Sequence, residues 1–191
     1  MREPCPGCGA LFASHTGPTH RYVGASAGCW ALYSELLIGS VPSSEVLAQS
    51  AVTPRESPAF SAPAMAEALM VDAYAAQHHG VPSPQAIQSV AVHLLVLHGT
   101  LGLGVESQRA LWIRQRALRQ RGVFHWLTPP AISRALTIRH LFPGTGVSRV
   151  CSPAEYVVSV YAAWSSMHGA QLDAWYRAYV DADAIPSERP A

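Results

Sequence analysis

Apolar residues recur along this chain mostly at intervals of three or four positions, which is the period of an amphipathic α-helix. The alternation of apolar and polar residues that is typical of half-buried β-strands is nearly absent. Capping serine or threonine residues precede several of these periodic segments, and proline or glycine follows them. The pattern predicts helices over residues 27–38, 63–77, 84–98, 106–121, 129–142 and 153–182.

Two of the predicted helix starts carry specific capping signals. Ser83 is followed by Pro84, which is tolerated at the first helical position because the N–H that proline lacks has no partner there. Ser152 and Glu155 have the spacing of a capping box. We expect an all-α fold, with a small zinc knuckle over residues 1–30, a helical bundle of about five to seven helices over residues 26–182, and a flexible tail over residues 183–191.

The composition fits one domain with ample material for a core, since 49% of the 191 residues are hydrophobic and 13% are charged. A net charge of +1 argues against duplex DNA or an acidic membrane surface as a dominant partner. The first residues contain no apolar segment of the kind found in signal peptides. The sequence has no run of about 18 apolar residues, so we expect no membrane-spanning helix. We expect a cytoplasmic protein. In that reducing compartment, clustered cysteines bind metal more often than they form disulfides.

The segment CPGCGALFASHTGPTHRYVGASAGCW contains three of the four cysteines. Cys5 and Cys8 are separated by two residues, a spacing that lets both sulfurs face one ion. Cys29 is the third candidate ligand, and His20 is preferred over His15 as the fourth because it lies nearer to the helix that carries Cys29. This Cys3His set predicts a closed, structural zinc site. A thioredoxin-like redox pair is the rival interpretation, and it requires a preceding strand and a βαβ context.

Seven short motifs follow one another from Cys5 to Trp175: CPGCG, GPTHRY, SAGCW, DAYAAQHHG, SPQAIQSVAVHL, FHWLTPP and AWSSMHGAQLDAW. In this order they resemble DUF5946, a bacterial family of unknown function. The resemblance implies a cytosolic bacterial protein whose distinctive residues lie in both the knuckle and the helices, and it implies no activity. Where the family motif reads QHPG this chain has QHHG, so His78 matches the histidine of the family and His79 replaces its proline.

Polar residues also recur inside apolar predicted helices, where they need a hydrogen-bonding partner or a ligand. Gln85, Ser89 and His93 lie at positions i, i+4 and i+8 of one helix and form a single polar stripe. We expect this stripe to face a wet pocket, which tryptophans could also line. The candidate substrate-binding residues are therefore Gln85, Ser89, Trp164 and Trp126.

Three histidines and one carboxylate from three separate predicted helices are the candidate catalytic residues: His93, His168, Asp72 and His78. Converging in a bundle, they would suit a second metal ion (zinc, iron or copper) or acid–base chemistry without one. Asp72 and His78 are about 120° apart on a regular helix, so they converge only if the helix ends or tightens before His78. The alternative is structural, with each histidine bonded to a backbone carbonyl and the aspartate capping a neighbouring helix.

Two function classes follow from these features. The first is a metal-dependent or acid–base enzyme that acts on a small metabolite in the polar pocket, and the internal stripe slightly favours it. The second is a non-catalytic binding or adaptor protein whose knuckle and arginine-rich helix, RALWIRQRALRQRG, contact a protein or nucleic-acid partner. A nucleophile–base pair of Cys151 and His168 also stays open. We expect a small-molecule ligand as the partner, rather than nucleic acid or a membrane, and leave homo-oligomerisation open.

Overall fold

The computed structural model describes residues 2–39, 62–106, 109–120, 123–132, 135–143, 147 and 149–181. Within these residues the chain is mostly helical, as the hydrophobic pattern predicts. The α-helices are α1 (Ala27–Gly39), α3 (Ala62–Gln77), α4 (Pro84–Leu97), α5 (Ala110–Arg119) and α6 (Pro153–Trp175). Two π-helical segments, η1 (His98–Gly102) and η5 (Tyr176–Val180), extend α4 and α6, and η4 (Ile138–Leu141) is a 3-10 turn. The predicted tail, residues 183–191, lies outside the described residues.

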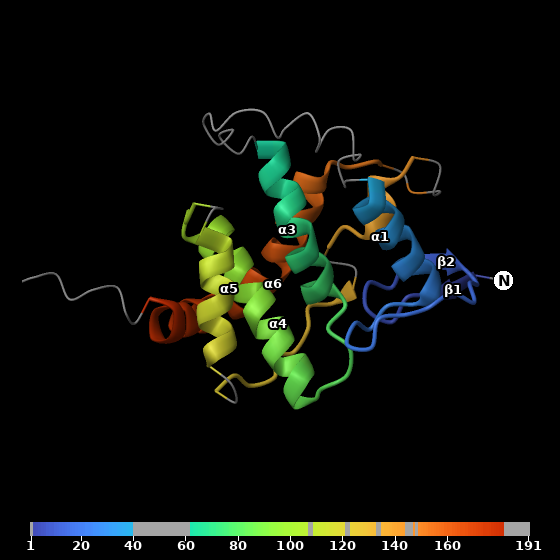
Figure 1. The fold of residues 1–191 in the computed structure, drawn as a ribbon. Coiled ribbons are helices and arrows are strands. Elements are labelled where there is room, and N and C mark those ends of the chain that lie inside the picture. Colours follow the sequence, from blue (N-terminus) through green and yellow to red (C-terminus); the bar gives the residue numbers. More distant parts are fainter. Residues whose placement is uncertain are drawn as a thin grey trace, which may run out of the picture.

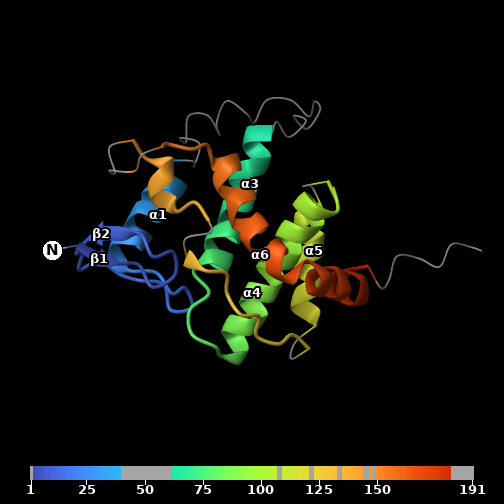
Figure 2. The same ribbon diagram turned by 180° about the vertical axis from the view of Figure 1, so that it is seen from behind.

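The helices pack around α3, which lies in the middle of the molecule (Figure 1). α3 packs against both α4 and α6, and α4 packs in turn against α5. From behind, α6 crosses the far side of α3, and its extension η5 contacts α5 (Figure 2). Large side chains with almost no exposure fill the space between these helices: Tyr74, Leu94, Leu95, Ile113, Tyr156, Trp164 and Leu172.

The apolar helix α4 is buried over most of its surface. The Ser83 side chain accepts a hydrogen bond from the Ala86 N–H at 3.1 Å, and Pro84 occupies the first turn. Buried residues then occur on nearly every side of the helix, which explains why its sequence is apolar almost all round. The capping box of Ser152 and Glu155 begins α6 in the same local way. Both capping predictions are confirmed.

Two short strands precede the first helix and form an antiparallel hairpin. β1 (Arg2–Pro4) pairs with β2 (Leu11–Ala13), and the turn between them carries Cys5 and Cys8. A hydrogen bond of 2.8 Å from the Cys5 N–H to the Ala10 carbonyl closes this turn. A strand therefore precedes the first cysteine, but among the described residues its partner is antiparallel and no βαβ unit exists. The hairpin gives no support to a thioredoxin-like redox pair.

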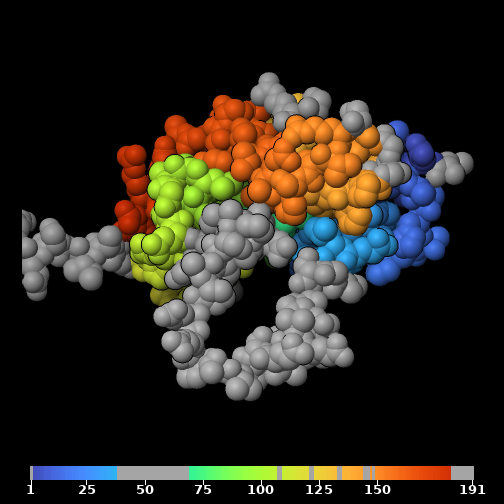
Figure 3. Space-filling model, turned by 90° about the horizontal axis from the view of Figure 1, so that it is seen from above, coloured from blue at the N-terminus to red at the C-terminus, as the bar shows by residue number. Residues whose placement is uncertain are grey.

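The hairpin and α1 lie together at one end of the molecule, and α5 lies at the opposite end (Figure 1). From above, the orange segment that leads into α6 lies against α1, in light blue, and η4 contacts α1 there (Figure 3). α1 also packs on β2, where a Cβ added to Gly28 would lie 2.9 Å from the Cβ of Phe12. No helix of the described residues is long and apolar enough to cross a membrane.

The helix predicted over residues 129–142 is wrong. Residues 123–131 have no regular secondary structure, and in the described part of this stretch η4 is the longest helical segment. Pro129 precedes Pro130, and a residue before proline is driven out of the α-helical backbone region by steric clash. Thr137 and His140 then form a capping box around η4 alone. The Thr137 cap could be found in the sequence, but it begins this later, shorter turn.

Candidate functional site

Three cysteines and one histidine meet where the hairpin contacts the ends of two helices. Cys5 and Cys8 come from the hairpin turn, Cys29 from the first turn of α1, and His78 from the residue that follows α3. Their four ligand atoms all lie within 4.8 Å of one another, and all four residues are buried. The Cys29 Sγ is 4.0 Å from the Cys8 Sγ and 3.3 Å from the His78 Nε2. These four residues, which we call the cysteine cluster, could hold a metal ion.

Glycines let the polypeptide approach His78 closely. A Cβ on Gly7 would lie 2.5 Å from the His78 Cδ2, and a Cβ on Gly24 would lie 2.7 Å from the Gly80 Cα. The Gly24 N–H donates a 2.8 Å hydrogen bond to the His78 carbonyl. The His78 Nδ1 donates to the Tyr74 carbonyl at 2.8 Å, so the Nε2 lone pair points at the sulfurs. The backbone thus holds the histidine in the tautomer that a metal ligand needs.

Protons are shared unevenly among the three buried thiols. Hydrogen bonds from Cys29 and Cys8 hold the pKa of Cys5 far below its usual range. The same hydrogen bond to Cys5, with burial, raises the pKa of Cys29 far above its usual range. The Ser26 N–H, at the start of α1, donates to the Cys5 Sγ at 3.4 Å, and a helix N-terminus favours a thiolate there.

The prediction of His20 as fourth ligand is corrected to His78. His20 is exposed, its ring centroid lies 5.2 Å from the Trp30 ring centroid, and its Nδ1 accepts a hydrogen bond from the Tyr22 N–H. His15 is also exposed and is not part of the cluster. Nearness along the chain favoured His20, whereas the fold brings in a residue 49 positions after the last cysteine of the cluster.

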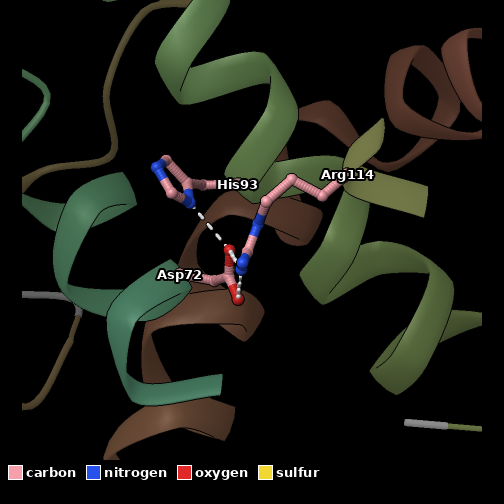
Figure 4. Close-up of polar contacts among 3 residues, drawn as sticks. All are labelled: Asp72, His93 and Arg114. Atoms are coloured by element: carbon pink, nitrogen blue, oxygen red, sulfur yellow. Dashed lines mark hydrogen bonds and ion pairs between the residues drawn. The ribbon is translucent and has the colours of Figure 1, made fainter. Parts of the chain in front are cut away.

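A second polar group joins three helices around Asp72 (Figure 4). The Asp72 side chain is 1% exposed; its Oδ1 lies 2.7 Å from the His93 Nδ1. The Arg114 Nη2 donates to both carboxylate oxygens, at 2.7 Å and 2.8 Å. Because an ionised carboxylate only accepts, His93 donates through Nδ1, which leaves Nε2 unprotonated in the neutral ring. Figure 4 shows this second ring nitrogen turned away from Asp72.

The four candidate catalytic residues do not converge on one point. Asp72 and His93 meet as predicted, but Arg114 is their third partner, and His78 belongs to the cysteine cluster. His168 donates from Nε2 to the Thr128 carbonyl at 2.8 Å, which matches the structural alternative. Among the described residues, no second group of three or more ligating side chains supports a second metal ion.

A nucleophile–base pair of Cys151 and His168 is also excluded by the fold. Cys151 lies just before α6, whereas His168 lies about 22 Å along that helix at roughly 1.5 Å per residue. Cys151 is buried, and this burial raises the pKa of its thiol. Cys151 therefore behaves as a small core residue.

The two tryptophans assigned to the pocket lie beside His79, away from the polar stripe. The ring centroid of Trp126 is 5.5 Å and that of Trp164 is 6.3 Å from the His79 ring centroid. Trp164 and His79 line a hollow of about 350 Å³ that also reaches Cys8. Burial lowers the pKa of His79, so its ring is uncharged at neutral pH. This hollow is separate from the one that the stripe faces.

The polar stripe of Gln85, Ser89 and His93 does face open space, as predicted. These three residues border two adjoining hollows of about 510 Å³ and about 900 Å³. We call the two hollows together the α4 cleft. Aromatic side chains line the first hollow opposite the stripe, and they are Tyr22, Trp30, Tyr33 and Tyr74 with His20. Arg114 and Phe124 line the second hollow.

Tyr74 connects the α4 cleft with the cysteine cluster. Its ring stacks on Tyr33 with centroids 3.7 Å apart and packs on the His78 ring at 4.0 Å. Its hydroxyl lies 3.5 Å from the Cys29 Sγ. The first wall of the cleft is thus built directly on residues that would bind the metal.

The chain matches a known family over almost its whole length. The family, described as a family of unknown function (DUF5946), aligns with residues 3–182. The chain belongs to this family. Comparison with curated proteins and with solved structures gives no match. In this DUF5946 chain, the four cluster residues all lie in motifs that carry the family resemblance, CPGCG, SAGCW and DAYAAQHHG.

Sequence reasoning missed the role of Arg114. It considered the arginine-rich helix as a contact for a partner, whereas the structure pairs Arg114 with a buried carboxylate. Two signals pointed to the pairing. An aspartate within an apolar segment needs a cationic or hydrogen-bonding partner, and Arg114 directly follows Ile113, which is fully buried. In this DUF5946 chain the partner of Asp72 comes from α5. No pattern in the sequence indicates that α5 lies near α3.

Proposed function

We propose that this protein is a cytoplasmic bacterial zinc protein and an acid–base enzyme that acts on a small metabolite in the α4 cleft. Zinc would hold the N-terminal hairpin as a knuckle against a helical bundle. His93, oriented by Asp72, would transfer the proton. The observation that carries the enzymatic part is the pairing of a fully buried carboxylate with a histidine that borders the cleft.

The donor set of the cysteine cluster fits zinc. Three thiolates and one imidazole form a common structural zinc site, and zinc–sulfur bonds of about 2.3 Å place tetrahedral sulfurs about 3.8 Å apart. The Cys8 and Cys29 sulfurs are 4.0 Å apart. Four protein ligands complete a tetrahedron, which is typical of a structural site without a position for substrate. Zinc would supply folding free energy by joining the hairpin to α1 and α3.

The arrangement around Asp72 fits a positioned general base. Burial of a carboxylate is costly unless it is paired, and Arg114 supplies the compensating charge. An ion pair alone would not need His93, yet the Asp72 Oδ1 also binds this ring and sets its tautomer. The His93 side chain keeps 19% of its surface exposed and borders both hollows of the cleft. Its Nε2 can thus accept a proton from a ligand.

The zinc site is tested by elemental analysis of untagged protein purified without added metal. We expect one zinc per chain, and we expect Cys29→Ser to lose most of it because three ligands bind zinc more weakly than four. Cys151→Ser is the matched control, since Cys151 is buried but lies outside the cluster. Metal-free wild-type protein, or a Cys29→Ser variant that keeps its full zinc, would contradict the proposal.

The catalytic role is tested with a mixture of polar metabolites, analysed by mass spectrometry before and after incubation with the protein. We expect at least one compound to be converted, and His93→Gln to slow this conversion by at least about a hundredfold, the lower range for general acid–base catalysis. His168→Gln is the control, because His168 bonds only to a backbone carbonyl. Conversion at the wild-type rate by His93→Gln, or no conversion by the wild type, would overturn the catalytic proposal.

The alternative, a binding or adaptor protein, has weaker support. It needs arginines of α5 that are free to contact a partner. The guanidinium carbons of Arg109 and Arg116 lie 4.6 Å and 5.2 Å from the centroid of the Trp112 ring, and Arg114 is held by Asp72. Arg109, at the start of this helix, and Arg114 and Arg116, near its middle, are thus in contact with other side chains of the protein. A wild-type protein that converts no metabolite but binds a protein or nucleic acid would favour this alternative.

A further inference from the structure

We propose that the ligand of the α4 cleft is a planar carboxylic acid, in which an aromatic or heteroaromatic ring bears one carboxylate. The inference rests on the proposed function only in taking the α4 cleft as the ligand site. It adds the chemical class of the ligand, which neither the family nor the acid–base pair specifies.

The first hollow has the wall of a ring-binding site. Trp30 is partly buried and packs on the rings of Tyr33 and Tyr74, with centroids 5.7 Å and 6.0 Å away. These two tyrosines are almost fully buried, so they support Trp30 from behind. The hollow of about 510 Å³ is within the usual size of small-molecule sites. Flat rings gain both apolar burial and quadrupole complementarity against such a wall.

The second hollow has the charge of an anion site. Arg114 lines it and its side chain is 33% exposed. The Arg114 Nη2 donates to both Asp72 oxygens, and the buried Arg114 Nε has no hydrogen-bond partner among the described residues. Asp72 lies beneath the surface and lines neither hollow, and no carboxylate is among the described residues that do. An anion in the cleft therefore meets the Arg114 guanidinium directly, while the Asp72 carboxylate that balances its charge is only 1% exposed.

The anion fits a carboxylate better than a phosphate. One partly exposed guanidinium whose charge Asp72 already balances suits a singly charged carboxylate, whereas a phosphate dianion usually draws several cations or a helix N-terminus. The Gln85 amide and the Ser89 hydroxyl, which also border the cleft, are neutral. They can donate one hydrogen bond each to a carboxylate or to a ring heteroatom.

The two hollows share the stripe of Gln85, Ser89 and His93, so a ligand lying over the stripe contacts both. The Asp72 Oδ1 is 2.7 Å from the His93 Nδ1 and 2.7 Å from the Arg114 Nη2. The imidazole and the guanidinium are therefore neighbours. The His93 Nε2 points away from Asp72 and Arg114, so the ligand carboxylate and the group that exchanges a proton with Nε2 would be separate parts of the ligand.

The test is a calorimetric titration of the zinc-loaded protein with indole-3-carboxylate and with indole-3-carboxamide, its uncharged counterpart of the same shape. NMR shifts of the Trp30 indole and the His93 ring locate the binding. We expect the carboxylate to bind at least about tenfold more tightly, since a charge-assisted hydrogen bond contributes more than a neutral one. Equal affinity for the two probes, or shifts confined to residues outside the cleft, would overturn the proposal.

Two variants separate the ring contact from the charge contact. We expect Arg114→Gln to remove the preference for the carboxylate, with Arg119→Gln, an exposed residue of the same helix, as the control. Arg114→Gln leaves the buried Asp72 carboxylate without its cationic partner and can unfold the protein. Trp30→Leu therefore gives an independent readout. This variant should weaken both probes about equally, by about tenfold. Unchanged affinity in Trp30→Leu would contradict the ring site.

Failure of this inference is distinguishable from failure of the proposed function. His93→Gln should still bind indole-3-carboxylate, because Arg114 and the aromatic wall remain. Carboxylate binding without conversion of any metabolite would leave the ligand class standing and remove the catalytic role. Conversion of a compound that carries no carboxylate would support the catalytic role and contradict the proposed ligand class.

Discussion

Replacement of Asp72 by asparagine removes the charge that holds His93 and Arg114. Two unit charges about 4 Å apart interact by about 4 kcal/mol at an effective dielectric constant of about 20. Loss of one partner from a buried pair costs about 3–5 kcal/mol, because the other charge remains desolvated. The Arg114 side chain is 33% exposed and can regain part of its hydration. We therefore expect Asp72→Asn to lower the free energy of unfolding by about 2–3 kcal/mol.

The assay is urea denaturation of the zinc-loaded protein at pH 7, followed by tryptophan fluorescence. Asp173→Asn is the matched control, because this carboxylate also pairs with a histidine, His98, but is 41% exposed. We expect the control to lose less than about 1 kcal/mol. The double variant Asp72→Asn, Arg114→Gln should recover part of the loss, since it leaves no unpaired guanidinium.

A loss below about 0.5 kcal/mol for Asp72→Asn would refute this reasoning, because surface substitutions have effects of that size. An equal loss in the Asp173→Asn control would refute it as well. Either result would mean that the ion pair is hydrated in solution, and His93 would then lack the fixed partner that sets its tautomer.

Three further expectations concern the metal and the start of α6. His78→Ala should lose zinc, as measured by elemental analysis, and have a lower thermal midpoint of unfolding. His20→Ala should keep one zinc per chain. Loss of zinc from His20→Ala but not from His78→Ala would restore His20 as the ligand. Ser152→Ala should cost about 1 kcal/mol in urea denaturation, as loss of an N-cap does, and no change would mean that α6 frays there. Hydrogen bonds from Ser152 lower the pKa of Glu155, so its carboxylate stabilises the fold above the usual carboxyl pKa and stops doing so as the pH falls. Glu155→Gln should therefore be less stable than the wild type at pH 7, and the difference should shrink as the pH falls below the usual carboxyl pKa. A difference that stays constant with pH would contradict this.

The sequence predicted those features that depend on neighbouring residues. The caps at Ser83 and Ser152 join groups within one helical turn, so their residue types reveal them directly. The polar stripe of α4 could be recognised because helical periodicity alone decides which side chains share a face. The three cysteine ligands could be recognised too, since two lie in one turn and the third starts the next helix.

A competition between local signals explains the helix that was wrongly predicted over residues 129–142. Thr128 and Pro129 suit a helix start, but the second proline, Pro130, disfavours helical backbone at the residue before it. Residues 123–131 have no regular secondary structure, and Leu127 packs into the core. Capping residues show where a helix can begin, and they do not show that one follows.

Only the tertiary structure decided the contacts that define the candidate sites. His78 replaced His20 as the fourth ligand because α3 ends against the hairpin, and Arg114 reached Asp72 because α5 packs on α4. His168 turned instead to a backbone carbonyl. Residue type and spacing indicate which side chains can bind a metal or transfer a proton. Which of them meet depends on how helices far apart in the sequence pack, because ligand and hydrogen-bond distances are fixed to within fractions of an ångström by that packing.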